Sequence, residues 1–338
     1  MARAKADFRN AFWTNVMFTK ICFPVILLLS GALFDAQAQV ARIGVLVPEM
    51  GRAQSQAQKG LVQELKRLGY QERKNIAFEI RDAKGNRNAL QAAAHELVAK
   101  KTNLIFATGT RASQAAMAAA RDLPIIFIHP GDPVAAGLFK SAGQPAGNVT
   151  GVAAYAAQTT GTRLALLKEI LPALAKVHVF FDSNNSFARE NFSLVELASK
   201  KLGLRVSGHG VKSVDELKAS VSAIPSDPGI AIFHIPDDLV ESEATFIFET
   251  ARKSKLPTMF NEEAWAIAGA MAAHGPDYLQ MGRQAGRLAE QILKRQAPGA
   301  LPIERAAKFD LTLNFRTANA IGVRLSQEML KKADRVIR

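Results

Sequence analysis

Short apolar runs alternate with helix-like segments along most of the sequence. The runs at 43–47, 104–107 and 125–128 are apolar at almost every position, and each is followed by apolar residues at helical spacing. A strand that is apolar on both faces is typical of a parallel sheet that helices cover on both sides. The alternation therefore predicts an α/β protein built on parallel sheets.

The alternation begins again after residue 155, which indicates a second unit of the same kind. Strands are expected at 177–181 and 230–234, followed by a single helix at 239–253. A chain of 338 residues has the length of two ordinary domains. We therefore predict two doubly wound parallel-sheet lobes joined by a multi-strand hinge. One hinge crossing is expected at 147–151, where glycine and asparagine favour turns.

The first 38 residues have the three parts of a secretory signal. A basic segment precedes an apolar run at 21–34, which is too short to span a bilayer comfortably. Ala36-Gln37-Ala38 then forms a small-residue cleavage site. We predict cleavage after Ala38 and a periplasmic product without Cys22, the sole cysteine; an uncleaved anchor is the alternative.

The chain is strongly basic, with a formal net charge of +13. Such a charge suits nucleic acid, anionic lipid or an acidic ligand. No run of five Lys or Arg residues occurs, and pairs such as Lys66-Arg67 and Lys200-Lys201 lie on expected amphipathic helices. We interpret the charge as a solvated surface and expect no nucleic-acid partner. A two-lobed regulator would also need a helix-turn-helix where the signal lies.

Catalytic motifs are missing from the sequence. The phosphate-binding loop, the G-x-S-x-G elbow, H-E-x-x-H and C-x-x-C do not occur. Gly208-His209-Gly210 is expected after a strand at 204–206 but lacks the full dinucleotide-binding pattern. We therefore predict no enzyme activity, no cofactor and no metal site; turnover by the purified protein would overturn this. The histidines are scattered without metal-ligand spacing: His95, His129, His178, His209, His234 and His274.

Polar residues follow the third and fourth expected strands. Thr108-Gly109-Thr110 offers hydroxyls and the free amides of a helix start, which can hold a carboxylate or phosphate. Ordinary helix capping by threonine is the alternative. Asp132 and Pro133 suit the cap and first position of another helix. His129 ends a strand and could reach the same edge of the sheet.

Acidic and amide side chains follow three strands of the second unit. They occur at 182–186, 236–238 and 261–263. Because the carboxyl ends of parallel strands meet at one edge, these clusters would surround a single cleft. A carboxylate there could pair with a ligand ammonium group. Helix capping by Asp and Asn is again the alternative for many of these residues.

Four motifs together resemble one family over residues 41–338. They are GDPVAAGL at 131–138, GNVTG at 147–151, GPDY at 275–278 and KFDLTLN at 308–314. The chain resembles the ABC transporter substrate-binding proteins of the type I periplasmic fold, typified by binders of tryptophan and other aromatic amino acids. The resemblance implies capture of an amino acid or related carboxylate in an interlobe cleft.

The resemblance also implies a division into parts and a set of partners. Beyond the signal at 1–38, lobe 1 would combine 39–153 with about 274–307, and lobe 2 would combine 154–273 with about 308–338. We expect a monomer that delivers its ligand to an ABC permease in the inner membrane. A periplasmic ligand-sensing subunit for a membrane receptor kinase is the alternative.

By the same resemblance, ligand contacts are expected at the strand ends of both lobes. Hydroxyls and helix N-termini would hold a carboxylate, and an acidic residue of lobe 2 an ammonium group. The loop at 48–52 and the pair His129-Pro130 depart from the family pattern. Arg52, Arg111 and His129, expected near the cleft, would favour a more anionic ligand. The expected contacts are Glu49, Ser55, Thr108, Thr110, Asp132, Asp182, Asn184, Ser186, Asp237 and Glu262.

Overall fold

The computed structural model describes residues 40–129, 131–134, 136–139 and 147–338. The expected signal peptide, its cleavage site after Ala38 and Cys22 lie outside the described residues. Among the described residues, no helix combines the length and the apolar composition that a membrane crossing requires.

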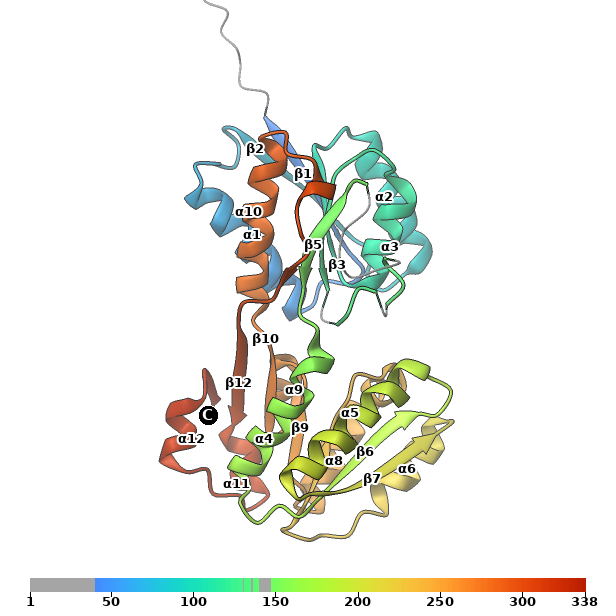
Figure 1. The fold of residues 1–338 in the computed structure, drawn as a ribbon, viewed down its shortest axis with the longest axis vertical. Helices are drawn as coiled ribbons and strands as arrows, with labels where there is room; N and C mark the ends of the chain where they lie inside the picture. Colours follow the sequence, from blue (N-terminus) through green and yellow to red (C-terminus); the bar gives the residue numbers. More distant parts are fainter. Residues whose placement is uncertain (1–39, 130, 135, 140–146) are drawn as a thin grey trace, which may run out of the picture. The chain divides into compact units, whose positions relative to one another are not determined.

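The first lobe is a six-stranded sheet in the order β11-β5-β4-β3-β1-β2, with every neighbouring pair parallel. Helices α1 and α10 cover one face, and α2 and α3 cover the other (Figure 1). The bounds are β1 Ala41–Val47, α1 Arg52–Arg67, β2 Ile76–Asp82, α2 Arg87–Ala99, β3 Leu104–Thr108, α3 Thr110–Ala119, β4 Ile125–His129, β5 Val149–Ala153, α10 Tyr278–Leu293 and β11 Glu304–Arg305.

Successive residues of β1 enter different hydrophobic cores. Val45 and Val47 pack in the core that includes α1 and α10, whereas Leu46 packs in the core that includes α2 and α3. Neighbouring side chains of a strand point to opposite faces of the sheet. An uninterrupted apolar strand is therefore needed here, as the sequence pattern predicts.

The second lobe is a seven-stranded sheet in the order β13-β12-β10-β9-β8-β6-β7, in which only the pairing of β10 with β12 is antiparallel among the described strands. The chain passes between the sheets after β5, after β10 and between β11 and β12. The bounds are α4 Thr160–Ile170, β6 Lys176–Asp182, α5 Ser186–Leu202, β7 Arg205–Val211, α6 Val214–Ser222, β8 Ile230–Phe233, α7 Asp238–Ser242, α8 Ala244–Lys253, β9 Thr258–Phe260, α9 Glu263–Ala268, β10 Ala272–Pro276, β12 Phe309–Asn314, α11 Phe315–Ala320, α12 Gln327–Lys332 and β13 Arg335–Ile337, with short 3-10 turns at Ala156–Thr159 and Pro298–Ala300.

Several local expectations are wrong. The single helix expected at 239–253 is in fact two helices, α7 and α8. The break occurs at Glu243, whose backbone leaves helical geometry and whose amide donates a hydrogen bond to Val240 O. Residues 149–151 belong to β5 rather than to a turn. Asp132 does not begin a helix: its Oδ1 accepts from the Val134 amide at 2.8 Å, which makes a local turn.

Gly208-His209-Gly210 lies inside β7 instead of following it. A Cβ on Gly208 would lie 2.3 Å from the Phe192 ring, so glycine lets α5 pack closely on the strand. The glycines therefore serve packing, and the strand continues through them in register with β6.

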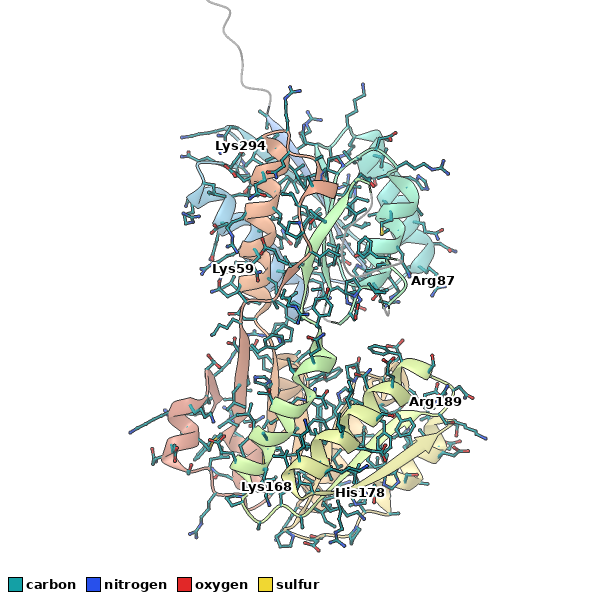
Figure 2. The ribbon with its side chains drawn as sticks, viewed as in Figure 1. Lys59, Arg87, Lys168, His178, Arg189 and Lys294 are labelled. Atoms are coloured by element: carbon teal, nitrogen blue, oxygen red, sulfur yellow. The ribbon has the colours of Figure 1, made fainter. Side chains whose placement is uncertain are left out.

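Basic side chains lie mainly on the outside of the molecule. Lys59, Arg87, Arg189 and Lys294 are exposed and extend away from the ribbon (Figure 2). This placement agrees with a solvated basic surface.

Helices α1 and α10 touch through glycine. A Cβ on Gly60 would lie 2.0 Å from Leu279 O, and one on Gly282 would lie 2.0 Å from Ala57 O. We expect Gly60→Ala to lower the free energy of unfolding by about 1–3 kcal/mol, because the helices must move apart. Urea denaturation measures the loss. The exposed neighbour Lys59→Ala is the control and should change stability by less than about 0.5 kcal/mol; equal effects of the two variants would contradict this packing.

Candidate binding pocket

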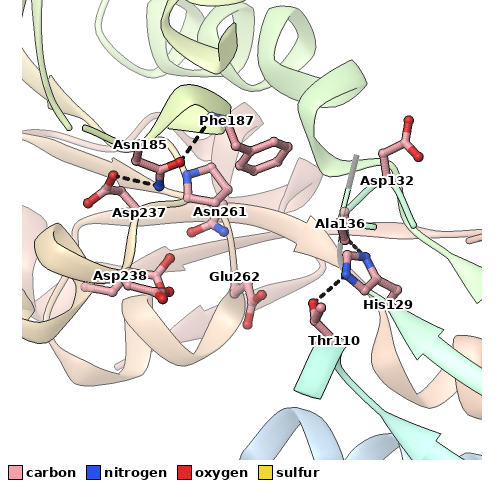
Figure 3. Close-up of a pocket in the computed structure, with 13 residues that line it drawn as sticks. Thr110, His129, Asp132, Ala136, Asn185, Phe187, Asp237, Asp238, Asn261 and Glu262 are labelled. Carbon is pink, nitrogen blue, oxygen red and sulfur yellow. Dashed lines mark hydrogen bonds between the residues drawn. The ribbon is translucent and has the colours of Figure 1, made fainter. Parts of the chain in front are cut away.

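A cavity of about 400 Å³ is lined by strand ends of both lobes (Figure 3). This is the edge at which open parallel sheets bind ligands. The first lobe contributes Thr110, His129, Gly131, Asp132 and Ala136, and the second contributes Asn185, Phe187, Pro236, Asp237, Asp238, Glu241, Asn261 and Glu262.

His129 sets the direction of a hydrogen bond on the first-lobe wall. Its Nδ1 accepts from the Gly131 amide at 2.9 Å, so the ring hydrogen lies on Nε2. Nε2 is 2.7 Å from Thr110 Oγ1 and donates to it. Burial lowers the pKa of His129, which keeps this neutral tautomer near neutral pH. The Thr110 hydroxyl is thereby left to donate its own hydrogen to an oxygen in the cavity.

Thr110 also begins helix α3. The preceding residue, Gly109, has φ of 82° and offers no side chain to the first amides of the helix. These amides carry the positive end of the helix dipole. Thr110 and the start of α3 therefore present hydrogen-bond donors and partial positive charge, which suit a carboxylate, on a wall that also carries the Asp132 carboxyl.

Asp237 is a carboxyl group held in place by hydrogen bonds on the second-lobe wall. Its Oδ1 accepts from the Val240 amide at 3.2 Å, and its Oδ2 accepts from the Asp182 amide at 3.0 Å. Asn185 Nδ2 adds a longer bond of 3.3 Å. Burial raises the pKa of Asp237, whereas the hydrogen bonds from Asp182 and Val240 oppose this shift; through the Val240 bond the side chain also caps α7.

Glu262 lies at the end of β9. Its Oε1 accepts from the Tyr278 hydroxyl at 2.8 Å. Burial raises the pKa of this carboxyl. A hydrogen-bonding cation beside it would favour the ionised form, so Glu262 is suited to an ammonium group from a ligand.

Glu241 lies on α7, close enough to Glu262 for their carboxyls to repel each other. Burial, and then repulsion by Glu262 and Asp238, raise the pKa of the Glu241 carboxyl to about 8. His234 does not neutralise it: the ring Nδ1 lies 3.0 Å from Asn261 Oδ1, and burial lowers the pKa of His234 to about 3. Its Nε2 lies 3.7 Å from Glu241.

The family model for ABC transporter substrate binding proteins matches residues 42–337. The chain belongs to this family. As a member, it is a substrate-binding protein that binds a small-molecule ligand within an ABC transporter system, and it is not an enzyme. The predicted family and the predicted lack of catalysis are confirmed.

Relatives of this substrate-binding protein include named amino-acid binders. A "Tyrosine-binding protein" of Clostridioides difficile (strain R20291) is 29% identical over 277 residues, or 81% of this chain and 79% of the relative. A structure from Streptococcus pneumonia in complex with L-Trp is 25% identical with a TM-score of 0.72, covering 88% and 99%. A conserved domain protein from Vibrio cholerae is 27% identical with a TM-score of 0.74, covering 88% and 100%. The two parallel-sheet lobes match type I periplasmic binding proteins, which confirms the fold class.

The structure brings four of the expected contacts of the binding protein together. Thr110, Asp132, Asp237 and Glu262 all line the cavity. Thr108 instead lines a smaller cavity of about 130 Å³, which Glu262 also borders. The expected contacts that do not line the main cavity are Glu49, Ser55, Asp182, Asn184 and Ser186, all of them exposed except the half-buried Asp182.

The expected basic residues lie elsewhere. Arg52 Nε contacts Glu263 at 2.7 Å, and Arg111 lines a separate depression with Arg87. Neither arginine lines the main cavity, so these two residues do not support the expectation of a more anionic ligand. His129 does line the cavity, but its ring is neutral.

The sequence reading missed several lining residues. Glu241 lies four residues after Asp237, one helical turn away, and this spacing was a usable signal. Asn185 caps α5, and its side chain accepts from the Phe187 amide at 3.1 Å (Figure 3). Within the described part of the chain, no group of three or more His, Cys, Asp or Glu side chains could hold a metal ion.

Glu241 should make stability depend on pH. The pKa of this carboxyl is near 4.5 in the unfolded chain and about 8 in the folded protein. Its contribution to the free energy of unfolding is therefore fully present below pH 4.5 and is lost as the pH rises from 4.5 to 8. We expect Glu241→Gln to flatten the fall in melting temperature over this range, measured without ligand. The exposed Glu249→Gln is the control. Parallel melting curves for Glu241→Gln and the unmodified protein would contradict the assignment.

Proposed function

We propose that this substrate-binding protein captures an amino acid in the cavity and delivers it to a membrane permease. The observation that carries the proposal is the opposition of the two walls. The first lobe offers hydrogen-bond donors at Thr110 and the start of α3, and the second offers the carboxyls of Glu241 and Glu262. This arrangement suits a zwitterion with a carboxylate at one end and an ammonium group at the other.

The relatives support the class of ligand. One is named for tyrosine binding and another was solved with L-Trp. In this chain the ligand carboxylate would accept from Thr110 and the α3 amides, and the α-ammonium would donate to Glu262. Thr108, whose buried hydroxyl lacks a hydrogen-bond partner, would line a side cavity next to Glu262.

Location and organisation belong to the same proposal. The signal-like residues 1–38 would direct the chain to the periplasm, where it would act as a monomer. The division into lobe 1, 39–153 with about 274–307, and lobe 2, 154–273 with about 308–338, would place the cavity at their junction. Ligand binding would then favour closure by its greater affinity for the closed state.

A thermal-shift screen tests the proposal. The purified protein is heated with each common amino acid and with small carboxylates that lack an amino group. We expect at least one amino acid to raise the melting temperature, since a ligand at one hundred times its Kd adds about 2.7 kcal/mol, and we expect the amine-free analogues to have no effect. If no amino acid raises it, the proposal is wrong.

A further inference from the structure

Acidic side chains line the cavity, although the chain as a whole is basic. The chain carries a net charge of +13, yet five carboxyl groups and no Lys or Arg are among the described residues that line the cavity. Building on the proposed function, we propose that the ligand is a basic amino acid, whose side chain carries a second cationic nitrogen. Glu262 would take the α-ammonium, and Glu241 with Asp238 would take the side-chain cation.

Basic side chains around the cavity are engaged with other groups, and buried Arg163, behind the second-lobe wall, donates to His234 O at 2.7 Å. Arg52 and Arg335 both contact the Glu263 carboxylate, which lies outside the cavity lining. Lys218 pairs with Glu243 at 3.0 Å. Among the described residues no Lys or Arg pairs with Glu241, and a single α-ammonium would leave Glu241 and Asp238 without a cationic partner.

His234 gives an independent indication behind this wall. Its side chain is fully buried, and Nε2 has no hydrogen-bond partner and is aimed at the Glu241 carboxyl, 3.7 Å away. Nδ1 faces Asn261 Oδ1, so it carries the ring hydrogen and Nε2 presents a lone pair. At 3.7 Å the Glu241 carboxyl makes no hydrogen bond to this lone pair, and a cationic nitrogen on the ligand would favour the ionised form of Glu241.

The remaining lining suits an alkyl chain between two charged ends. Phe187 and Pro236 offer apolar surface on the same lobe, and Phe187 is the one aromatic side chain among the described lining residues besides the His129 ring. Methylene groups of a lysine-like side chain would pack there while both nitrogens reach carboxyls. A large aromatic side chain would leave Glu241 and Asp238 without a cation.

The test compares ligands that differ in one charge. Full-length protein is expressed, purified and titrated calorimetrically with L-lysine, L-ornithine, L-norleucine, putrescine, L-tyrosine and L-tryptophan. We expect a basic amino acid to bind at least tenfold more tightly than L-norleucine, which matches lysine without its terminal ammonium. Putrescine should bind more weakly than lysine because it lacks the carboxylate. Preference for tyrosine or tryptophan would overturn this inference but leave the proposed function standing; absence of binding by all six would also overturn the inference, and the thermal-shift screen with every common amino acid then decides the proposed function.

Variants of Glu241 and Asp238 test whether these residues bind the side-chain cation of the ligand. Glu241→Gln should reduce the lysine-to-norleucine affinity ratio at least tenfold, and Asp238→Asn, on the exposed side of the same wall, should reduce it at least threefold. Glu249→Gln, exposed on α8 outside the cavity, should leave it unchanged. If Glu241→Gln does not fold, Asp238→Asn decides alone. An unchanged ratio in the folded variants would overturn the assignment.

Discussion

Glu262→Gln is expected to weaken amino-acid binding at least thirtyfold, or about 2 kcal/mol. The substitution keeps the shape of the side chain and an oxygen for the Tyr278 hydroxyl, whose bond to Glu262 is 2.8 Å. It removes the charge that would pair with the ligand ammonium in a largely desolvated cavity. Titration calorimetry of the best ligand from the screen measures the change.

A matched control separates this effect from general damage. Glu249→Gln makes the same chemical change on the exposed face of α8 and should leave the affinity unchanged. The melting temperature of Glu262→Gln without ligand should not fall, because burial already raises the pKa of this carboxyl and a neutral amide removes that cost. Tight binding retained by folded Glu262→Gln would rule out Glu262 as the ammonium partner.

Arg163→Met is expected to raise the free energy of unfolding by about 1–2 kcal/mol. Arg163 is 1% exposed on α4. It donates to His234 O at 2.7 Å and lies 4.6 Å from the Phe233 ring centre. None of the described carboxylates pairs with it, and burial lowers its pKa to about 9. Methionine fills similar space without a buried charge.

Arg163→Ala separates the effect of removing the charge from the effect of leaving a cavity. It removes the charge but leaves a cavity, so we expect it to lower the free energy of unfolding by about 2–5 kcal/mol. The advantage of Arg163→Met should narrow above pH 9, because the folded arginine loses its proton before the unfolded one does. Urea denaturation at two pH values measures both effects; a destabilised Arg163→Met would show that the charge itself supports the fold.

The long elements were predictable because their patterns are local. The apolar strand at Ile43 must face helices on both sides, and this requirement is visible in the sequence. The short strands Glu304–Arg305 and Arg335–Ile337 were not predictable, because they exist only through pairing with β5 and β12. Two or three residues carry too little periodicity to be recognised.

The pocket was predictable where it follows strand ends directly. Thr110, Asp237 and Glu262 lie within four residues of a strand end, so the parallel-sheet rule locates them. Glu241 lies one helical turn further on, and Phe187 enters the cavity only because Asn185 caps α5 beside it. Such positions depend on how a helix is oriented after its cap, which a single sequence does not specify.

A crystal structure of the complex with the tightest-binding amino acid is the most direct test of this binding mode. We expect the ligand in the main cavity, with its α-ammonium within hydrogen-bond distance of the Glu262 carboxylate and its carboxylate at the Thr110 hydroxyl. A ligand bound elsewhere, or one whose carboxylate faces the Glu262 wall, would contradict it.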